Sequence, residues 1–298
     1  MSNIYKFMKK IAFIVDTCST IKNSELKDVY VLPLTINITN KKTNEIKSYR
    51  DLVDITGKDL EKYLDSNDYT VTTSQSSAGD IIKLVEKIYD KYDEIYVLPI
   101  PLFLSGSANT WELISKDYEK LVVGKENKNV VEGIKWDIME LQEMTKNNTL
   151  NPKTFNRYIE KVQKTCAGVL FVSDITQLSK GGRVSNFKSM LLKLMRLKIV
   201  IMCDKNGLKF FKTTKNFIKG FDIVINEYKK RISGFDLKKI KKVCFQLGPS
   251  NKKNPEMVKL INYVKGLLPP KAKLTIDTIP NVILAHTGAK AIVIKLKI

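Results

Sequence analysis

The sequence predicts an α/β protein of two layered units, with a mainly parallel sheet in the first half and a mixed α/β layer in the second. In the first half, short apolar runs typical of buried strands alternate with a segment of helical periodicity. In the second half, Asn206-Gly207 separates two apolar runs, which is the pattern of an antiparallel hairpin. At about 150 residues per domain, the 298 residues indicate two domains, expected at 1–155 and 156–298.

The strands of the first half are predicted from uninterrupted apolar runs. The first is expected at 11–15, and it ends in a turn rich in hydroxyl groups, DTCST at residues 16–20. Two further strands are expected at 29–34 and 94–100. Because helices separate runs of this kind in open α/β sheets, we expect these strands to pair mainly in parallel.

The helices of the first half are predicted from capping residues and spacing. Ser77 is placed to cap a helix whose apolar residues recur every three or four positions. Another helix is expected directly after Ser105-Gly106, and Asn151-Pro152 combines a cap with a first-turn proline. The predicted order is therefore strand, loop, helix and strand.

The second half is predicted to mix parallel and antiparallel strands. It is expected to contain a strand at 168–173, a loop broken by glycines at 179–183 and an amphipathic helix at 187–197. The hairpin brings antiparallel pairing into this sheet. The remaining expected elements are one helix and five strands, at 255–267, 199–203, 208–211, 243–247, 274–279 and 291–296.

The composition is that of a globular protein, with 43% hydrophobic residues. No apolar run approaches the roughly 20 residues that span a bilayer, and the N-terminus lacks a cleavage pattern, so we expect a cytoplasmic location. Four widely separated cysteines and the single histidine, His286, form no zinc-binding pattern. The thiols are expected to be reduced, and no metal is expected.

The charge is strongly positive, +20 at neutral pH. Such an excess favours acidic partners, namely nucleic acid, anionic lipid surfaces or an acidic protein. Only five of the 51 basic residues are arginine, however, and lysine lacks the planar fork that reads bases and phosphates. We therefore interpret most of the excess as compositional bias, and nucleic acid is not an expected partner.

Two clusters of small polar residues precede expected helices. The first is TTSQSS at 72–77, which includes Thr73 and Ser74, and the second contains Ser105, Gly106 and Ser107. Hydroxyl groups and backbone amides at a helix N-terminus can bind an anion. Each cluster taken alone is equally compatible with a capping loop.

Two further clusters lie in the second half. The motif AHTG contains His286 and Thr287 and is expected to form a loop between two short strands, and the basic loop SKGGR ends at Arg183. A lone histidine is usually structural, and a glycine-rich basic loop is often only a surface turn. Phosphate-binding and dinucleotide-binding glycine motifs are absent from the sequence, so we expect no ATP binding by this chain alone.

Taken together, these motifs resemble the DegV family, which includes the fatty-acid-binding (FakB-type) subunits of bacterial fatty acid kinase. The resemblance rests on DTCST, TSQ, LSG, KGGR and AHTG, which occur in the family's order over about 275 residues. Several positions differ from the family pattern: Ser76 replaces a proline, Pro101-Leu102 replaces two serines, and Ser107 replaces a threonine. The lysine-proline before the hairpin strand is Lys198-Ile199.

The resemblance implies a two-domain protein that holds one long-chain fatty acid between its domains and uses no cofactor of its own. By motif position, Thr73, Ser105 and His286 would bind the carboxylate, supported by Ser74, Gly106, Ser107 and Thr287. Arg183 would serve acyl transfer with a separate kinase catalytic subunit, which forms an acyl phosphate for phospholipid synthesis. The basic surface would assist docking to that kinase or brief contact with an anionic membrane surface.

Two other functions remain open from the residues alone. A serine hydrolase would use Ser105 as the nucleophile, His286 as the base and Asp16 as its partner, although the Gly-x-Ser-x-Gly motif is absent. A nucleic-acid-binding protein would use the net charge, although no recognisable binding module is present. Ester turnover that depends on Ser105, or steeply salt-dependent nucleic-acid binding, would distinguish these two from a lipid carrier.

Overall fold

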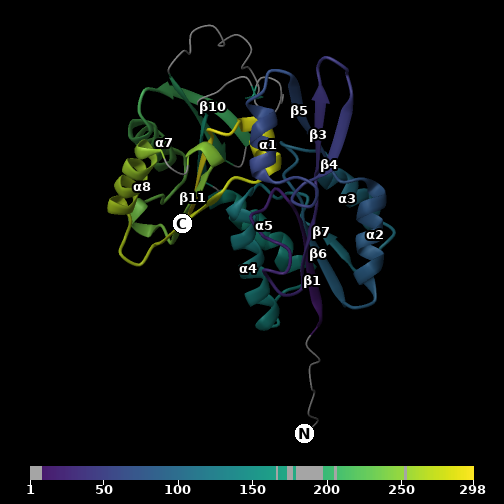
Figure 1. Ribbon diagram of the computed structural model, residues 1–298. Helices are drawn as coiled ribbons and strands as arrows, with labels where there is room; N and C mark the ends of the chain where they lie inside the picture. The colour runs from purple at the N-terminus through teal and green to yellow at the C-terminus, as the bar shows by residue number, and fades with distance from the viewer. Residues whose placement is uncertain (1–8, 166, 173–176, 179–196, 205–206, 252–253) are drawn as a thin grey trace.

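The computed structural model describes residues 9–165, 167–172, 177–178, 197–204, 207–251 and 254–298 (Figure 1). Its first half is built on a parallel sheet in the order β2-β1-β6-β7. The strands are β1 (Ile11–Asp16), β2 (Val29–Leu32), β6 (Glu94–Leu98) and β7 (Leu121–Val123). The predicted parallel pairing is therefore confirmed.

Helices cover both faces of this sheet, as the alternation of side chains along β1 requires. Ala12 and Ile14 pack against α2 (Ala78–Tyr89) and α3 (Ser107–Ser115). Phe13 and Val15 belong to the core shared with α4 (Glu132–Lys146) and α5 (Pro152–Thr165). Figure 1 shows the two helix pairs on opposite sides of the strands. The side chain of Ser77 accepts the Asp80 amide and caps α2, as predicted.

A three-stranded antiparallel sheet in the order β4-β3-β5 was not predicted. Its strands are β3 (Thr35–Asn40), β4 (Ile46–Arg50) and β5 (Tyr69–Ser74), and α1 (Gly57–Leu64) packs against β5. Only alternate residues of these strands are apolar, and β4 is almost wholly exposed, so they lack the continuous apolar run of a buried strand. The polar cluster at 72–77 is accordingly not one loop, because it begins as the end of β5.

The second half contains a six-stranded mixed sheet in the order β10-β9-β8-β13-β11-β12. The strands are β8 (Ala167–Val172), β9 (Lys198–Asp204), β10 (Gly207–Thr214), β11 (Lys242–Leu247), β12 (Lys273–Thr278) and β13 (Ile292–Lys297). The predicted hairpin forms, with Asp204 opposite Gly207 in an antiparallel register. The helix α8 (Pro255–Leu267) has the predicted bounds and connects the parallel pair β11 and β12.

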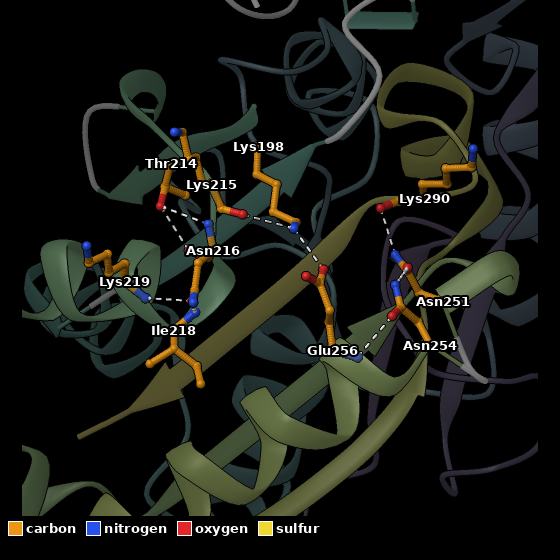
Figure 2. A network of polar contacts seen from close by, with 10 residues as sticks. All are labelled: Lys198, Thr214, Lys215, Asn216, Ile218, Lys219, Asn251, Asn254, Glu256 and Lys290. Carbon is orange, nitrogen blue, oxygen red and sulfur yellow. Dashed lines mark hydrogen bonds and ion pairs between the residues drawn. The ribbon is translucent and has the colours of Figure 1, made fainter. Parts of the chain in front are cut away.

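One face of the six-stranded sheet is covered by α7 (Phe217–Arg231) and α8, on the left of Figure 1. A polar network tethers the start of both helices to β9, as Figure 2 shows. Asn216 accepts the amides of Ile218 and Lys219 at 2.8 and 3.2 Å and so caps α7. Lys198 on β9 forms an ion pair with Glu256 in the first turn of α8, at 2.7 Å. Two short 3₁₀ turns, Leu237–Lys239 and Pro249–Asn251, complete this half.

The inner face of the six-stranded sheet contributes to the same core as the first half. That core combines Val15 from the parallel sheet, Ile36 from the small sheet, and Leu170 and Ile201 from the large one. The helix α9 (Asn281–Thr287) inserts Val282, Leu284 and Ala285 into it. The three sheets therefore enclose one shared apolar interior, while the expected domain boundary near residue 155 stays a prediction.

The structure corrects the expected loop around His286. This residue lies in the last turn of α9, which follows β12 and precedes β13. Seven residues are too few to display a full apolar periodicity, and the helix is fixed by burial of Leu284 and Ala285. Nearly all of the expected helix at 187–197, and the whole loop at 179–183, lie outside the described residues. No helix in the described ranges is long and apolar enough to cross a membrane.

Candidate functional site

A cavity lies where the three sheets meet. Counted out into the open solvent at its mouth, the space between its lining atoms is about 930 Å³. Most of its wall is apolar, with side chains from the six-stranded sheet, from α9 and from the loops that follow the strands of the parallel sheet. These include Leu34, Ile100, Leu104, Val130, Leu170, Leu208, Val282, Ile283 and Val293.

The polar end of the cavity is formed where β5 meets α9. Thr73, at the end of β5, and His286, at the end of α9, both line the space and are both half-buried. The Thr73 hydroxyl and Nε2 of His286 form a hydrogen bond of 2.7 Å. The two residues were predicted to belong to one site, and they are in direct contact in the structure.

Ser105 lines the same cavity from the turn between β6 and α3. The amides of Leu104 and Ser105 bond to the Pro101 carbonyl at 2.9 and 3.1 Å, which closes a tight turn. The Ser105 hydroxyl accepts the amide of Ser107 at 3.2 Å and so orients the start of α3. A hydroxyl that accepts one bond can still donate its hydrogen, so Ser105 can donate to an anion in the cavity.

Gln75 also lines the cavity and was not singled out from the sequence. Its Nε2 donates to the hydroxyl of Thr110 on α3 at 2.8 Å, which ties the end of β5 to the helix that follows Ser105. Ser76, which stands where the family has a proline, is buried and donates to the Pro33 carbonyl at 2.7 Å. This hydrogen bond therefore fixes the conformation of the loop at the position where the family has a proline.

The supporting residues expected from the motifs have mixed roles. Ser74 lines the cavity, but its exposed hydroxyl accepts Nδ2 of Asn37 at 3.1 Å across the small sheet. Thr287 lines it too, and its hydroxyl donates to the Ile283 carbonyl at 2.9 Å within α9. At Gly106 an added Cβ would meet nothing closer than 3.6 Å, so its backbone does not require glycine. Ser107 is buried as the first residue of α3.

The Asp16 carboxylate is hydrogen-bonded to backbone amides. Its carboxylate accepts the amides of Cys18 and Ile100 at 3.0 and 2.7 Å, which joins the loops that follow β1 and β6. Burial raises the pKa of this carboxyl against those hydrogen bonds. Asp16 is not among the described residues that line the cavity of Ser105 and His286. The geometry thus gives Asp16 a structural role in place of the one a hydrolase would need.

The inner wall of the cavity holds residues that the sequence did not mark. Gly168 on β8, Cys203 on β9 and Lys295 on β13 line it. Lys295 has only 2% of its surface exposed, although its neighbours in the wall are mainly apolar. One signal in the sequence could have identified Lys295: it lies in a short strand and has apolar residues on both sides.

The described residues include no group of three or more His, Cys, Asp and Glu side chains placed to hold a metal ion. Burial raises the pKa of the Cys18 thiol well above its ordinary value, and that of Cys244 to about 12. Such thiols are poor nucleophiles at neutral pH. Arg183, expected near the mouth of the site, lies outside the described residues.

Comparisons with known proteins give matches over nearly the whole chain. The profile of the DegV family, described as uncharacterised proteins, matches residues 10–296. A DegV domain-containing protein of Mycoplasma pneumoniae is 28% identical over 297 residues, covering 96% of this chain and 98% of that protein. One from Staphylococcus aureus is 25% identical, with 96% and 98% covered.

Solved structures share the fold. A DegV family protein from Thermus thermophilus, described by its fatty acid binding, superposes with a TM-score of 0.79 at 18% identity, covering 96% of this chain and 99% of that one. The Fatty Acid Kinase B3 protein of Streptococcus pneumoniae, loaded with linoleic acid, gives 0.76 at 13% identity, with 97% and 99% covered. The α/β fold expected from the sequence, with a parallel sheet and a mixed sheet, is thus confirmed.

Proposed function

The chain belongs to the DegV family, and on that premise we propose that it binds one long-chain fatty acid and presents the carboxylate to a separate kinase. Structural neighbours that bind fatty acids support this, as does the neighbour that is a fatty acid kinase protein. The observation that carries the proposal is the hydrogen bond between Thr73 and His286 at the polar end of a mainly apolar cavity.

The polar end suits a carboxylate that has no counter-charge. Removing an anion from water is costly unless hydrogen bonds to its charged form replace the lost hydration. The hydroxyls of Thr73 and Ser105 and the amides that begin α3 supply such donors, and Nε2 of His286 donates to the Thr73 hydroxyl, which leaves the hydrogen of that hydroxyl for the carboxylate. The dipole of α3 adds a favourable potential for negative charge.

The remainder of the cavity suits an acyl chain. Each methylene removed from water contributes about 0.8 kcal/mol, so a long chain gains on the order of 10 kcal/mol before the cost of ordering. The described part of the wall is mainly apolar, so it favours a hydrocarbon tail over a polar one. Such a ligand is expected to remain bound through purification.

The protein would act by presentation. The kinase would deliver phosphate to the exposed carboxylate, so the carrier needs no nucleophile of its own. The acyl phosphate would then remain in the cavity as an intermediate for phospholipid synthesis. Arg183 would assist this transfer, and the lysine-rich surface would favour an acidic face on the kinase, with brief contact to anionic lipid as a further use.

Mass spectrometry of an organic extract from gently purified protein tests the proposal. We expect free fatty acid in a molar ratio to protein near one. The same sample, supplied with a DegV-partner kinase and ATP, should yield acyl phosphate. An empty protein that also fails to bind added fatty acid would refute the proposal.

A further inference from the structure

A buried lysine lies in the wall of the acyl cavity. Lys295, the fourth residue of β13, is 2% exposed. Lysine is rarely buried this completely, because its charge loses hydration unless polar groups take the place of water. Its four-carbon stem is nevertheless apolar and can form part of a lipid-facing wall.

The strand register places Lys295 at the end of the cavity away from His286. β13 begins at Ile292, just after α9, and Val293 and Lys295 share one face of it. Val293 lies opposite Leu170, and Lys295 lies opposite Gly168. Lys295 is thus two residues, or roughly 6–7 Å, farther along the strand from α9 than Val293 is.

The stem of Lys295 crosses this inner end. A Cβ added at Gly168 would lie 3.5 Å from Cδ of Lys295, and a Cβ added at Gly133 would lie 2.8 Å from its Cε. The stem therefore runs from β13 past the backbone of β8 to the first turn of α4. At Gly133 the absence of a side chain is required by this close approach.

A second, smaller cavity lies on the far side of the stem. Lys295 lines both spaces, and the smaller one is otherwise bounded by Asn129, Trp136, Asp137, Val162, Thr165 and the end of β13. The stem is thus a partition between an apolar chamber and a polar one.

The polar chamber is lined by a buried carboxylate as well as by Lys295. The buried carboxylate of Asp137 accepts Nδ2 of Asn129 at 2.6 Å and the Tyr158 hydroxyl at 2.9 Å. The positive charge of Lys295 acts on this carboxylate and favours its ionised form. Lys295 therefore borders a space with a buried carboxylate on one side and a mainly apolar space on the other.

We propose that Lys295 closes the inner end of the acyl cavity and so limits the length of the fatty acid that the protein accepts. This inference rests on the proposed function, because it concerns the tail of the same ligand. Removing the stem would join the two cavities and make room for a few further methylenes.

Two variants test the partition from opposite directions. Lys295→Ala, combined with Asp137→Asn to avoid an unpaired buried carboxylate, should admit longer chains. We expect the ratio of bound C20 to bound C16 saturated acid to rise about tenfold in competition, since about two extra methylenes become buried. Gly168→Ala narrows the same end with an added methyl group and leaves Lys295 in place, so the ratio should fall.

Lys242→Ala is the control, because Lys242 lies on the neighbouring strand β11, opposite Lys297, and is not among the described residues that line either cavity. Asp137→Asn alone separates loss of the buried carboxylate from loss of the stem. The inference would be overturned if the wild type and the variants carried fatty acids of the same chain lengths in the same proportions. A wild type that binds no fatty acid would instead overturn the proposed function.

Discussion

The hydroxyl of Thr73 lies 2.7 Å from Nε2 of His286, although 213 positions separate the two residues in the chain. This contact joins β5 of the small sheet to α9, the helix that leads into the large sheet. It therefore links the polar end of the cavity to both halves of the protein.

Thr73→Val together with Ser105→Ala should weaken fatty-acid retention. Each substitution removes a hydroxyl donor near the carboxylate, and a hydrogen bond to a charged group contributes about 1.5–3 kcal/mol. We expect affinity for a fluorescent fatty acid to fall roughly 100-fold or more. Ser74→Ala is the control, because that hydroxyl faces Asn37. Unchanged affinity in the double variant would contradict the assignment of the carboxylate site.

His286→Ala should reduce acyl-phosphate formation more than it reduces lipid binding. The imidazole bonds to the Thr73 hydroxyl and so orients that donor beside the reacting oxygen in the proposed complex, while Ser105 still binds the carboxylate. Arg183→Ala is expected to show the same pattern through the kinase. Both rates are measured with reconstituted kinase and compared with lipid content. Equal losses of binding and phosphorylation would show that these residues only maintain the pocket.

The Asp137 carboxyl should make stability depend on pH. Burial raises its pKa from 3.8 to about 6, against the opposing effects of Asn129, Lys297, Tyr158 and Lys295. The folded state thus binds this proton more tightly than the unfolded chain, so its contribution to stability falls as pH rises from about 4 to about 6. The full shift corresponds to about 3 kcal/mol as an upper figure.

Urea unfolding of the wild type and of Asp137→Asn between pH 4 and pH 7 measures this contribution. The wild type should lose stability relative to the variant as pH rises. Asp54→Asn is a control that should leave the pH dependence between pH 4 and pH 7 unchanged, because hydrogen bonds from Arg50 lower the pKa of Asp54 below 3.8. The Asp54 contribution is present above its ordinary pKa and is lost as pH falls. Parallel curves for wild type and Asp137→Asn would contradict the assigned shift.

Association with the kinase should weaken as salt increases. The net charge of +20 favours an acidic partner surface, and exposed charges are screened over about 8–10 Å at physiological ionic strength. We expect the association rate to fall at least several-fold between 50 and 300 mM salt, with a smaller change in the dissociation rate. Surface plasmon resonance over this range measures both rates. An association rate that does not change with salt would show that the excess of lysine reflects compositional bias and does not contribute to binding the kinase.

Local rules account for much of the fold. The buried strands β1, β6 and β8 follow from uninterrupted apolar runs, and α2 and α8 begin at the capping residues Ser77 and Asn254. The antiparallel hairpin of β9 and β10 follows from Asn-Gly chemistry. These features depend on interactions within a few residues, so a short window of sequence contains their causes.

The sequence motifs also identify polar residues of the site. Thr73, Ser105 and His286 are predicted from their motifs, and all three line one cavity. The motifs do not reveal the helix that carries His286, since α9 is only seven residues long and is held by burial against distant strands. The sheet of β3, β4 and β5 escapes prediction because its half-exposed strands lack a continuous apolar run.

The amino-acid sequence alone thus determines the α/β class, the main capped helices and which polar residues line the cavity at Thr73, Ser105 and His286. Packing decides that Thr73 meets His286, that Asp16 binds backbone amides, and that Lys295 divides two cavities. The physical reason is the separation along the chain between the residues that interact. Caps and periodic patterns are satisfied by near neighbours in the chain, whereas a cavity wall is formed by residues that only chain closure brings together.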